Sequence, residues 1–202
     1  MGKNQQVEAP LAYYRELYLK SEAREIEART GLRFDAAAGC FGVTLVGKQY
    51  YVKHPEFSVS PSLSPYEEIL LLRFLLEGRF APGTGRMLAY EELPQGAVYM
   101  AQFQGRNIGR FAREFGRDPG RLKAALEAIP GLNYEAVSGA DVGYRLEFLD
   151  GLFISILLWE ADEEFPASAQ LLFSDNFKYA FTAEDVAVVG DVLIGRLKAA
   201  LK

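Results

Sequence analysis

The dipeptide Asp150-Gly151 separates two apolar stretches and predicts a tight β-hairpin, which limits the folds open to this chain more than any other local pattern. Both residue types tolerate the positive φ angles of a two-residue hairpin turn. Strands are therefore expected over residues 144–149 and 152–159. Uninterrupted pairing across this turn would place Phe148 opposite Phe153.

The second stretch of this hairpin, residues 152–159, is apolar at nearly every position and does not alternate. This pattern predicts a central strand that is covered on both faces. Its last residue, Trp159, opens an acidic segment that ends at Pro166. We call residues 159–166 the acidic-aromatic rim, and we expect this rim to emerge at the edge of a buried sheet.

The carboxylates of the acidic-aromatic rim have two competing interpretations. Carboxylate oxygens suit a hard cation such as Mg²⁺ or Ca²⁺, and the candidate ligands are Asp162, Glu164 and Asp175. Two carboxylates could also act as general acid and base if Trp159 or Phe165 excluded water from one of them. The alternative is that Asp162 only accepts backbone N–H groups and shapes the turn, which is the commoner use of Asp.

Residues 103–117 predict a helix that carries an arginine stripe opposite an apolar face. The apolar face consists of Ile108, Phe111 and Phe115. The arginine stripe consists of Arg106, Arg110, Arg113 and Arg117. Guanidinium groups bind oxyanions bidentately, so the stripe could hold a phosphorylated ligand or an acidic protein surface. A solvated helix face that pairs with nearby Glu residues is the commoner explanation of such a pattern.

Charge and cysteine content exclude several classes of protein. The net charge of −5 argues against a general affinity for nucleic acid or for an anionic membrane, since both need excess Lys and Arg. Cys40 is the only cysteine, which leaves no internal disulfide and no thiolate-held cluster. With no signal-peptide pattern and no cofactor-binding loop, we expect a cytoplasmic protein without a cofactor. His54, the only histidine, is expected to be structural.

Local signals predict the remaining elements. Helices are expected over residues 10–30 with a stop at Gly31, over residues 65–77 with a cap at Ser64, and after a cap at Thr182. A second hairpin is expected over residues 41–54 with its turn at Gly47-Lys48. We predict a single domain over residues 1–202, frayed over residues 1–9, of the α+β class. Its mainly antiparallel sheet would be packed by the buried central helix, residues 65–77, and by the C-terminal helix.

Three segments resemble one bacterial family. Residues 159–167 follow the pattern W-x-x-D-E-E-F-P-A, Leu171-Leu172-Phe173 comes next, and Thr182-x-Glu184-Asp185 opens the last helix. Together they are similar to the DUF3786 family, a domain of unknown function found mostly in anaerobes. The resemblance runs from about Leu32 to the C-terminus and implies no established reaction. Where that family usually reads L-F-D, this chain reads Phe173-Ser174-Asp175, which shifts or removes any role of the acid.

Three functional hypotheses follow. The first is a binding or accessory module of an anaerobic bacterium that recognises a small molecule or a protein, and the absence of a nucleophile–base pair favours it. The second is a divalent-metal-assisted hydrolase or transferase built around Asp162. The third is a structural protein or homodimer. The candidate site residues are the arginine stripe together with Trp159, Asp162, Glu163, Glu164, Phe165 and Asp175.

Overall fold

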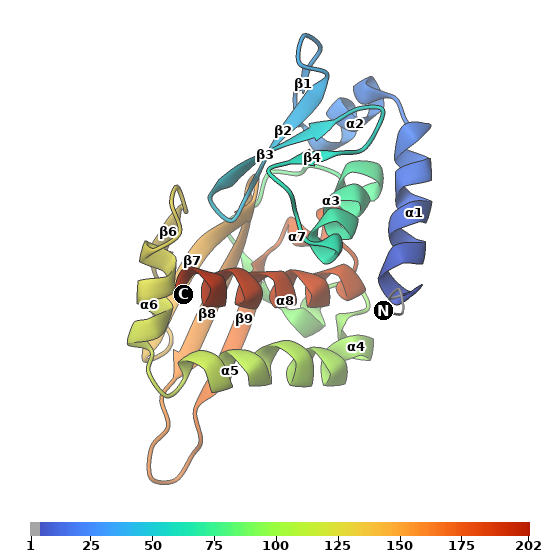
Figure 1. Cartoon of the computed structure of the whole chain (residues 1–202). Helices are drawn as coiled ribbons and strands as arrows, with labels where there is room; N and C mark the ends of the chain where they lie inside the picture. Colours follow the sequence, from blue (N-terminus) through green and yellow to red (C-terminus); the bar gives the residue numbers. More distant parts are fainter. Residues whose placement is uncertain (1–4) are drawn as a thin grey trace. The chain divides into compact units, whose positions relative to one another are not determined.

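The computed structural model describes residues 5–202 and divides into two compact units (Figure 1). The first unit comprises the described residues up to Thr44, with Gln49–Ala81 and Tyr179–Phe181. The second unit comprises Leu45–Lys48, Pro82–Lys178 and Thr182–Lys202. Antiparallel strand pairs occur in both units together with helices, so the predicted α+β class is confirmed.

The first unit contains the helices α1 (Gln5–Leu19), α2 (Ala23–Thr30) and α3 (Pro65–Glu77). The prediction of one helix over residues 10–30 is wrong, because the chain leaves the helix after Leu19. There the Ser21 hydroxyl donates to the Tyr18 carbonyl at 2.7 Å, a local bond that competes with the helical ladder. Residues 5–9, which we expected to fray, form the start of α1, and residues 1–4 lie outside the described residues.

Both ends of α3 match the sequence-based prediction. The Ser64 hydroxyl accepts from the backbone N–H of Glu67, and the Glu67 carboxylate accepts from the backbone N–H of Ser64 at 2.8 Å. This reciprocal pair satisfies two donors that a helix start would otherwise leave unpaired. The helix ends before Gly78 and packs beside α1 and α2 within the first unit.

The second predicted hairpin forms between β2 (Cys40–Leu45) and β3 (Lys48–Lys53), with β1 (Phe34–Asp35) and β4 (Val59–Ser60) as neighbours. Its turn lies at Val46-Gly47, one residue earlier than predicted, with φ of 46° and 73°. The predicted inward face is confirmed, since Phe41, Val43 and Val52 are buried.

His54 is half-buried and packs among aromatic side chains of the first unit. Its ring meets the Tyr18 ring edge-on at a centroid distance of 5.0 Å and the Phe34 ring at 5.9 Å. Cys40 is buried in the same unit. Burial lowers the pKa of His54, because an imidazolium would lose its hydration there.

The strands of the second unit follow the order β6, β7, β8, β9, β5. Their bounds are β5 Met87–Ala89, β6 Tyr134–Ala136, β7 Val142–Leu149, β8 Leu152–Trp159 and β9 Ser168–Ser174. The predicted hairpin at Asp150-Gly151 is confirmed as β7 and β8. Strand β8 is paired on both edges and buried along most of its length, as its apolar sequence predicts.

The register of the β7–β8 hairpin differs by one residue from the prediction. Leu149 pairs with Leu152 but Glu147 pairs with Phe153, so Phe148 is the extra residue of a β-bulge. The Phe148 carbonyl accepts from the backbone N–H of Val46 at 2.8 Å, outside the β7–β8 ladder. This partner satisfies the backbone of the bulge, and the predicted Phe148–Phe153 pair is therefore wrong.

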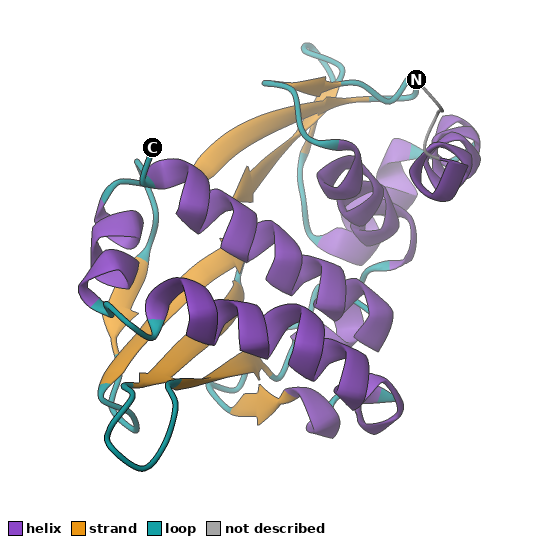
Figure 2. Ribbon diagram, turned by 60° about the horizontal axis from the view of Figure 1, so that its bottom comes forward, coloured by secondary structure: helices purple, strands orange, loops and turns teal. Residues whose placement is uncertain are grey.

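Helices cover one face of the strands in the second unit (Figure 2). A continuous helical run consists of α4 (Gly96–Phe103), the π-helical segment η2 (Gln104–Ile108) and α5 (Gly109–Phe115). The helix predicted over residues 103–117 thus begins earlier, at Gly96. The other helices are η1 (Tyr90–Glu92), α6 (Gly120–Glu127), α7 (Phe177–Ala180) and α8 (Ala183–Ala200), the last with the predicted cap at Thr182.

Candidate functional site

Asp162 organises the acidic-aromatic rim, which forms the loop between β8 and β9. Its Oδ1 accepts from the backbone N–H groups of Glu164 at 2.8 Å and of Phe165 at 2.6 Å. The backbone N–H of Asp162 donates to the Phe165 carbonyl at 3.0 Å. The two bonds to Oδ1 lower the pKa of Asp162, because they stabilise its charged form. This geometry matches the turn-shaping interpretation of Asp162.

Asp175 lies at the opposite end of β9 from the rim. Its carboxylate accepts from the backbone N–H of Thr84 at 3.0 Å and from the Thr84 hydroxyl at 2.6 Å, and these bonds lower its pKa. A strand of 7 residues separates it from the rim by about 23 Å. The structure therefore does not bring Asp162 and Asp175 together. Within residues 5–202, no three His, Cys, Asp or Glu side chains are grouped to hold a metal ion.

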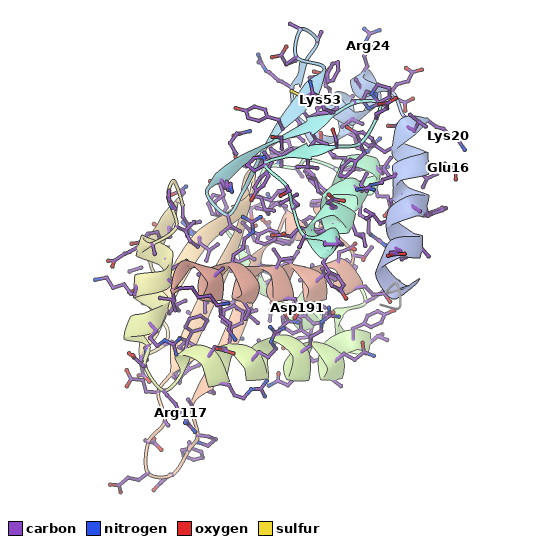
Figure 3. All side chains as sticks on the ribbon, viewed as in Figure 1. Glu16, Lys20, Arg24, Lys53, Arg117 and Asp191 are labelled. Atoms are coloured by element: carbon purple, nitrogen blue, oxygen red, sulfur yellow. The ribbon has the colours of Figure 1, made fainter. Side chains whose placement is uncertain are left out.

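The arginine stripe divides into two pairs. Arg106 and Arg110 both form ion pairs with Asp191 of α8, and the Arg110 Nη1 to Asp191 Oδ1 distance is 2.5 Å. Figure 3 labels Asp191 on α8 and Arg117, the last residue of the stripe. Arg113 and Arg117 are exposed and have no charged partner in the described part of the chain. The stripe thus joins two helices at one end and is solvated at the other.

A cavity of about 260 Å³ opens beside the start of β9 in the second unit. We call it the Trp159 cavity. Three segments line it: residues 89–91 at the end of β5, residues 169–171 of β9, and the α4–η2 run. The side chains from that run are Met100, Phe103, Gln104 and Ile108. Trp159, the last residue of β8, completes the lining.

The apolar wall of the Trp159 cavity is fixed by a pair of stacked rings. The Tyr90 and Phe103 rings are parallel to within 2°, with centroids 3.8 Å apart. The Tyr90 hydroxyl donates to the Ala183 carbonyl at 2.8 Å. Burial, with a smaller contribution from Glu184, raises the pKa of Tyr90, so the hydroxyl keeps its proton. Both rings are buried, so they fix the shape of the cavity lining but expose almost no surface of their own to a ligand.

Three polar side chains of the Trp159 cavity have no hydrogen-bond or ion-pair partner within residues 5–202. They are Glu91, Gln104 and Gln170. These two carboxamides and one carboxylate line the same cavity as apolar side chains, and a few such polar groups can orient a ligand.

The π-helical segment η2 forms one side of this cavity, since its first and last residues, Gln104 and Ile108, both line it. Asn107 of the same segment is buried, and neither its Oδ1 nor its Nδ2 has a partner in the described structure. π-Helical segments occur frequently at functional sites. The nearest sequence signal is a pair of glycines, Gly105 within the segment and Gly109 directly after it, which alone does not predict a π-helix.

Of the candidate residues predicted from sequence, Trp159 is the one that lines the Trp159 cavity. The rim carboxylates lie on the exposed loop beyond it, and Phe165 is 66% exposed. Sequence reasoning did not identify Tyr90, Phe103 or Gln170 as site residues. In the sequence these three residues resemble ordinary core or strand residues, and only the folded chain brings them together.

Comparison with known proteins identifies the family but no function. No curated protein and no solved structure matches this chain. None of the helices within residues 5–202 combines the length and apolar character that a membrane span requires. A family model described as a domain of unknown function, DUF3786, matches residues 22–196, which is most of the chain. The chain therefore belongs to the DUF3786 family.

Proposed function

We propose that the protein is a binding or accessory module whose recognition site is the Trp159 cavity. The observation that carries this proposal is the cavity itself, with its lining shaped by the stacked Tyr90 and Phe103 rings and its polar side chains that lack intramolecular partners. The half-buried Met100 and Trp159 supply apolar contact, and the free carboxamides of Gln104 and Gln170 supply orientation. The acidic-aromatic rim begins at the cavity mouth and adds negative charge beside it.

The titratable groups of the cavity support binding and not catalysis. Glu91 and Tyr90 are the titratable side chains in its lining, and the Tyr90 hydroxyl is already bonded to the Ala183 carbonyl. General acid–base catalysis needs two groups that can exchange protons with a substrate. A lone exposed carboxylate does not provide that pair.

Binding can be tested with a neutral apolar fluorophore, N-phenyl-1-naphthylamine, which accepts excitation energy from tryptophan. Trp159 is the only tryptophan of the chain and lines the cavity, so energy transfer detects bound fluorophore, and substitutions in and outside the cavity then locate it. We expect saturable energy transfer in the native protein. In Ala169→Phe the new ring fills part of the cavity, and binding should weaken by about tenfold.

Ala101→Phe is the matched control, because Ala101 is exposed on α4 and does not line the cavity. It should bind the fluorophore like the native protein. Thermal unfolding of both variants verifies that each remains folded. Absence of saturable transfer in the native protein, or equal binding by Ala169→Phe, would refute the cavity as the recognition site.

A further inference from the structure

Strand β9 leaves part of its main-chain edge without a strand partner. On one edge β9 pairs with β8 along residues 168–173. On the other edge β5 pairs only with residues 172–174. Residues 168–171 therefore have no strand on that edge in the described structure. Unpaired N–H and C=O groups on a sheet edge can serve as a template for another strand. This edge carries no Lys or Pro, the residues that commonly block such pairing.

The open edge and the Trp159 cavity lie at the same place. Ala89, the last residue of β5, pairs with Leu172, and the chain then turns away into η1. The cavity is lined both by Ala89 and by residues 169–171 of the open edge. It thus lies where a continuation of β5 would run.

We propose that the ligand of this module is an extended peptide segment that adds a strand beside residues 168–171 and inserts one side chain into the Trp159 cavity. The inference rests on the proposed binding function and names its partner. A segment of four residues covers about 13 Å of edge. Because peptide groups alternate between the two edges of a strand, about half of these residues offer their N–H and C=O to the partner. The backbone supplies affinity, and the cavity supplies side-chain selectivity.

The charge around the open edge favours a basic peptide. Glu91 lies at the Leu171 end, and the rim carboxylates lie at the Ser168 end, because Trp159 pairs with Ser168. No side chain among residues 5–202 forms an ion pair with these carboxylates. They are Glu91, Glu160, Asp162, Glu163 and Glu164. Gly116 lies against Ala167, which follows the rim, so Arg117 lies near the rim carboxylates. Arg117 and Arg113 offset only part of the negative charge of these carboxylates.

A second copy of this chain is the less favoured occupant. Edge-to-edge pairing of two identical chains would be isologous and would match the acidic patch with itself. Like charges across an interface repel, whereas Lys or Arg at both ends of an extended peptide would meet carboxylates.

The test uses the blocked peptide Lys-Val-Leu-Val-Lys and its displacement of N-phenyl-1-naphthylamine from the full-length protein. Two N-methylated isomers, one modified at both Val and the other at Leu and the second Lys, remove alternate main-chain donors. We expect one isomer to bind about tenfold more weakly and the other to bind like the parent, because only one set faces the open edge. The peptide Glu-Val-Leu-Val-Glu should also bind about tenfold more weakly.

Glu160→Gln combined with Glu163→Gln should weaken binding of the Lys peptide and leave binding of the neutral fluorophore unchanged, since both positions are exposed on the rim and neither lines the cavity. Amide hydrogen exchange should slow at residues 168–171 when the Lys peptide is bound.

The outcomes separate this inference from the proposed function. If the fluorophore binds but the Lys peptide neither displaces it nor protects residues 168–171, the strand-addition inference is wrong and the cavity remains a small-molecule site. Equal affinity of the parent and both N-methylated isomers would also overturn it. Protection of residues 168–171 by dimerisation without peptide would identify a second copy as the occupant. Failure of the fluorophore itself would remove the proposed function.

Discussion

Gly190 of α8 packs against the side chain of Asn107 in the π-helical segment η2. A Cβ atom built at Gly190 would overlap Asn107 Oδ1 and approach Asn107 Cγ to 2.6 Å. The contact therefore requires the absence of a side chain at position 190. It couples α8 to the segment whose first and last residues line the Trp159 cavity.

Gly190→Ala should destabilise the protein, although alanine normally stabilises a helix interior. The gain from helix propensity is about 0.5–1 kcal/mol, whereas forcing a methyl group into a closed space costs about 1–3 kcal/mol. Gly195→Ala in the same helix is the control, because nothing lies within 4 Å of a Cβ there, and it should stabilise by about 0.5–1 kcal/mol. Chemical denaturation measures both changes. A gain of stability in Gly190→Ala would show that Asn107 moves freely.

Asp162→Asn should be tolerated better than Asp162→Ala, because an amide keeps an acceptor oxygen for the N–H groups of Glu164 and Phe165. Added Mg²⁺, Mn²⁺ or Ca²⁺ should leave the melting temperature of the native protein unchanged. A true metal site would instead gain about 2.7 kcal/mol at a hundredfold excess of metal over its Kd. A saturable rise in melting temperature that Asp162→Asn abolishes would support a metal-assisted function.

The pH dependence of stability should depend on His54. Burial lowers its pKa below the ordinary value of 6.5, and its Nδ1 has no hydrogen-bond partner in the described structure. Just below pH 6.5 the imidazole of His54 takes up a proton in the unfolded chain but not in the folded protein. The free energy of unfolding therefore falls as the pH decreases through 6.5, and it levels off below the pKa of His54 in the folded protein. Melting temperatures between about pH 8 and pH 5.5 measure this loss, because most carboxylates stay ionised there. His54→Phe keeps an aromatic ring and should flatten the profile, and an unchanged slope would assign the loss to other groups.

Asp191→Asn should destabilise the protein by about 0.5–1 kcal/mol, because it removes ion pairs to both Arg106 and Arg110. These pairs are partly exposed, so the loss should shrink at high salt. Arg113→Gln provides the control from the same stripe and should change stability by less than about 0.5 kcal/mol, since Arg113 has no partner within residues 5–202. Equal effects of the two substitutions would contradict the division of the stripe into bonded and solvated pairs.

Short-range sequence signals determined two helix starts and one hairpin turn. Ser64 and Thr182 begin their helices with the predicted caps, and the Asp150-Gly151 turn joins the predicted strands. Inward faces also follow from sequence, since Val186, Val189 and Leu193 of α8 are all buried. These features depend on contacts within a few residues and on the period of apolar side chains, both of which the sequence displays directly.

A tertiary contact determined the hairpin register, whereas the helix break depends on a local bond that helix propensity does not predict. The bulge at Phe148 depends on the N–H of Val46, which is distant in sequence and is absent from any local pattern. The helix predicted over residues 10–30 breaks at Ser21, where one hydroxyl bond replaces helical pairing. The two hairpin registers, and likewise the continuous and the broken helix, differ in free energy by about the contribution of one hydrogen bond, so propensity alone does not decide between them.

The candidate site follows the same division. The sequence identified Trp159, because it ends a buried strand and opens the acidic-aromatic rim. It could not identify the Trp159 cavity, since Tyr90, Phe103 and Gln170 come from segments far apart in the chain. The sequence also suggested a shared site for Asp162 and Asp175, but a strand of 7 residues between them holds them about 23 Å apart. Proximity across the sheet and between helices is a property of the folded chain and decided the cavity, whereas the separation of the carboxylates follows from the length of the extended strand between them.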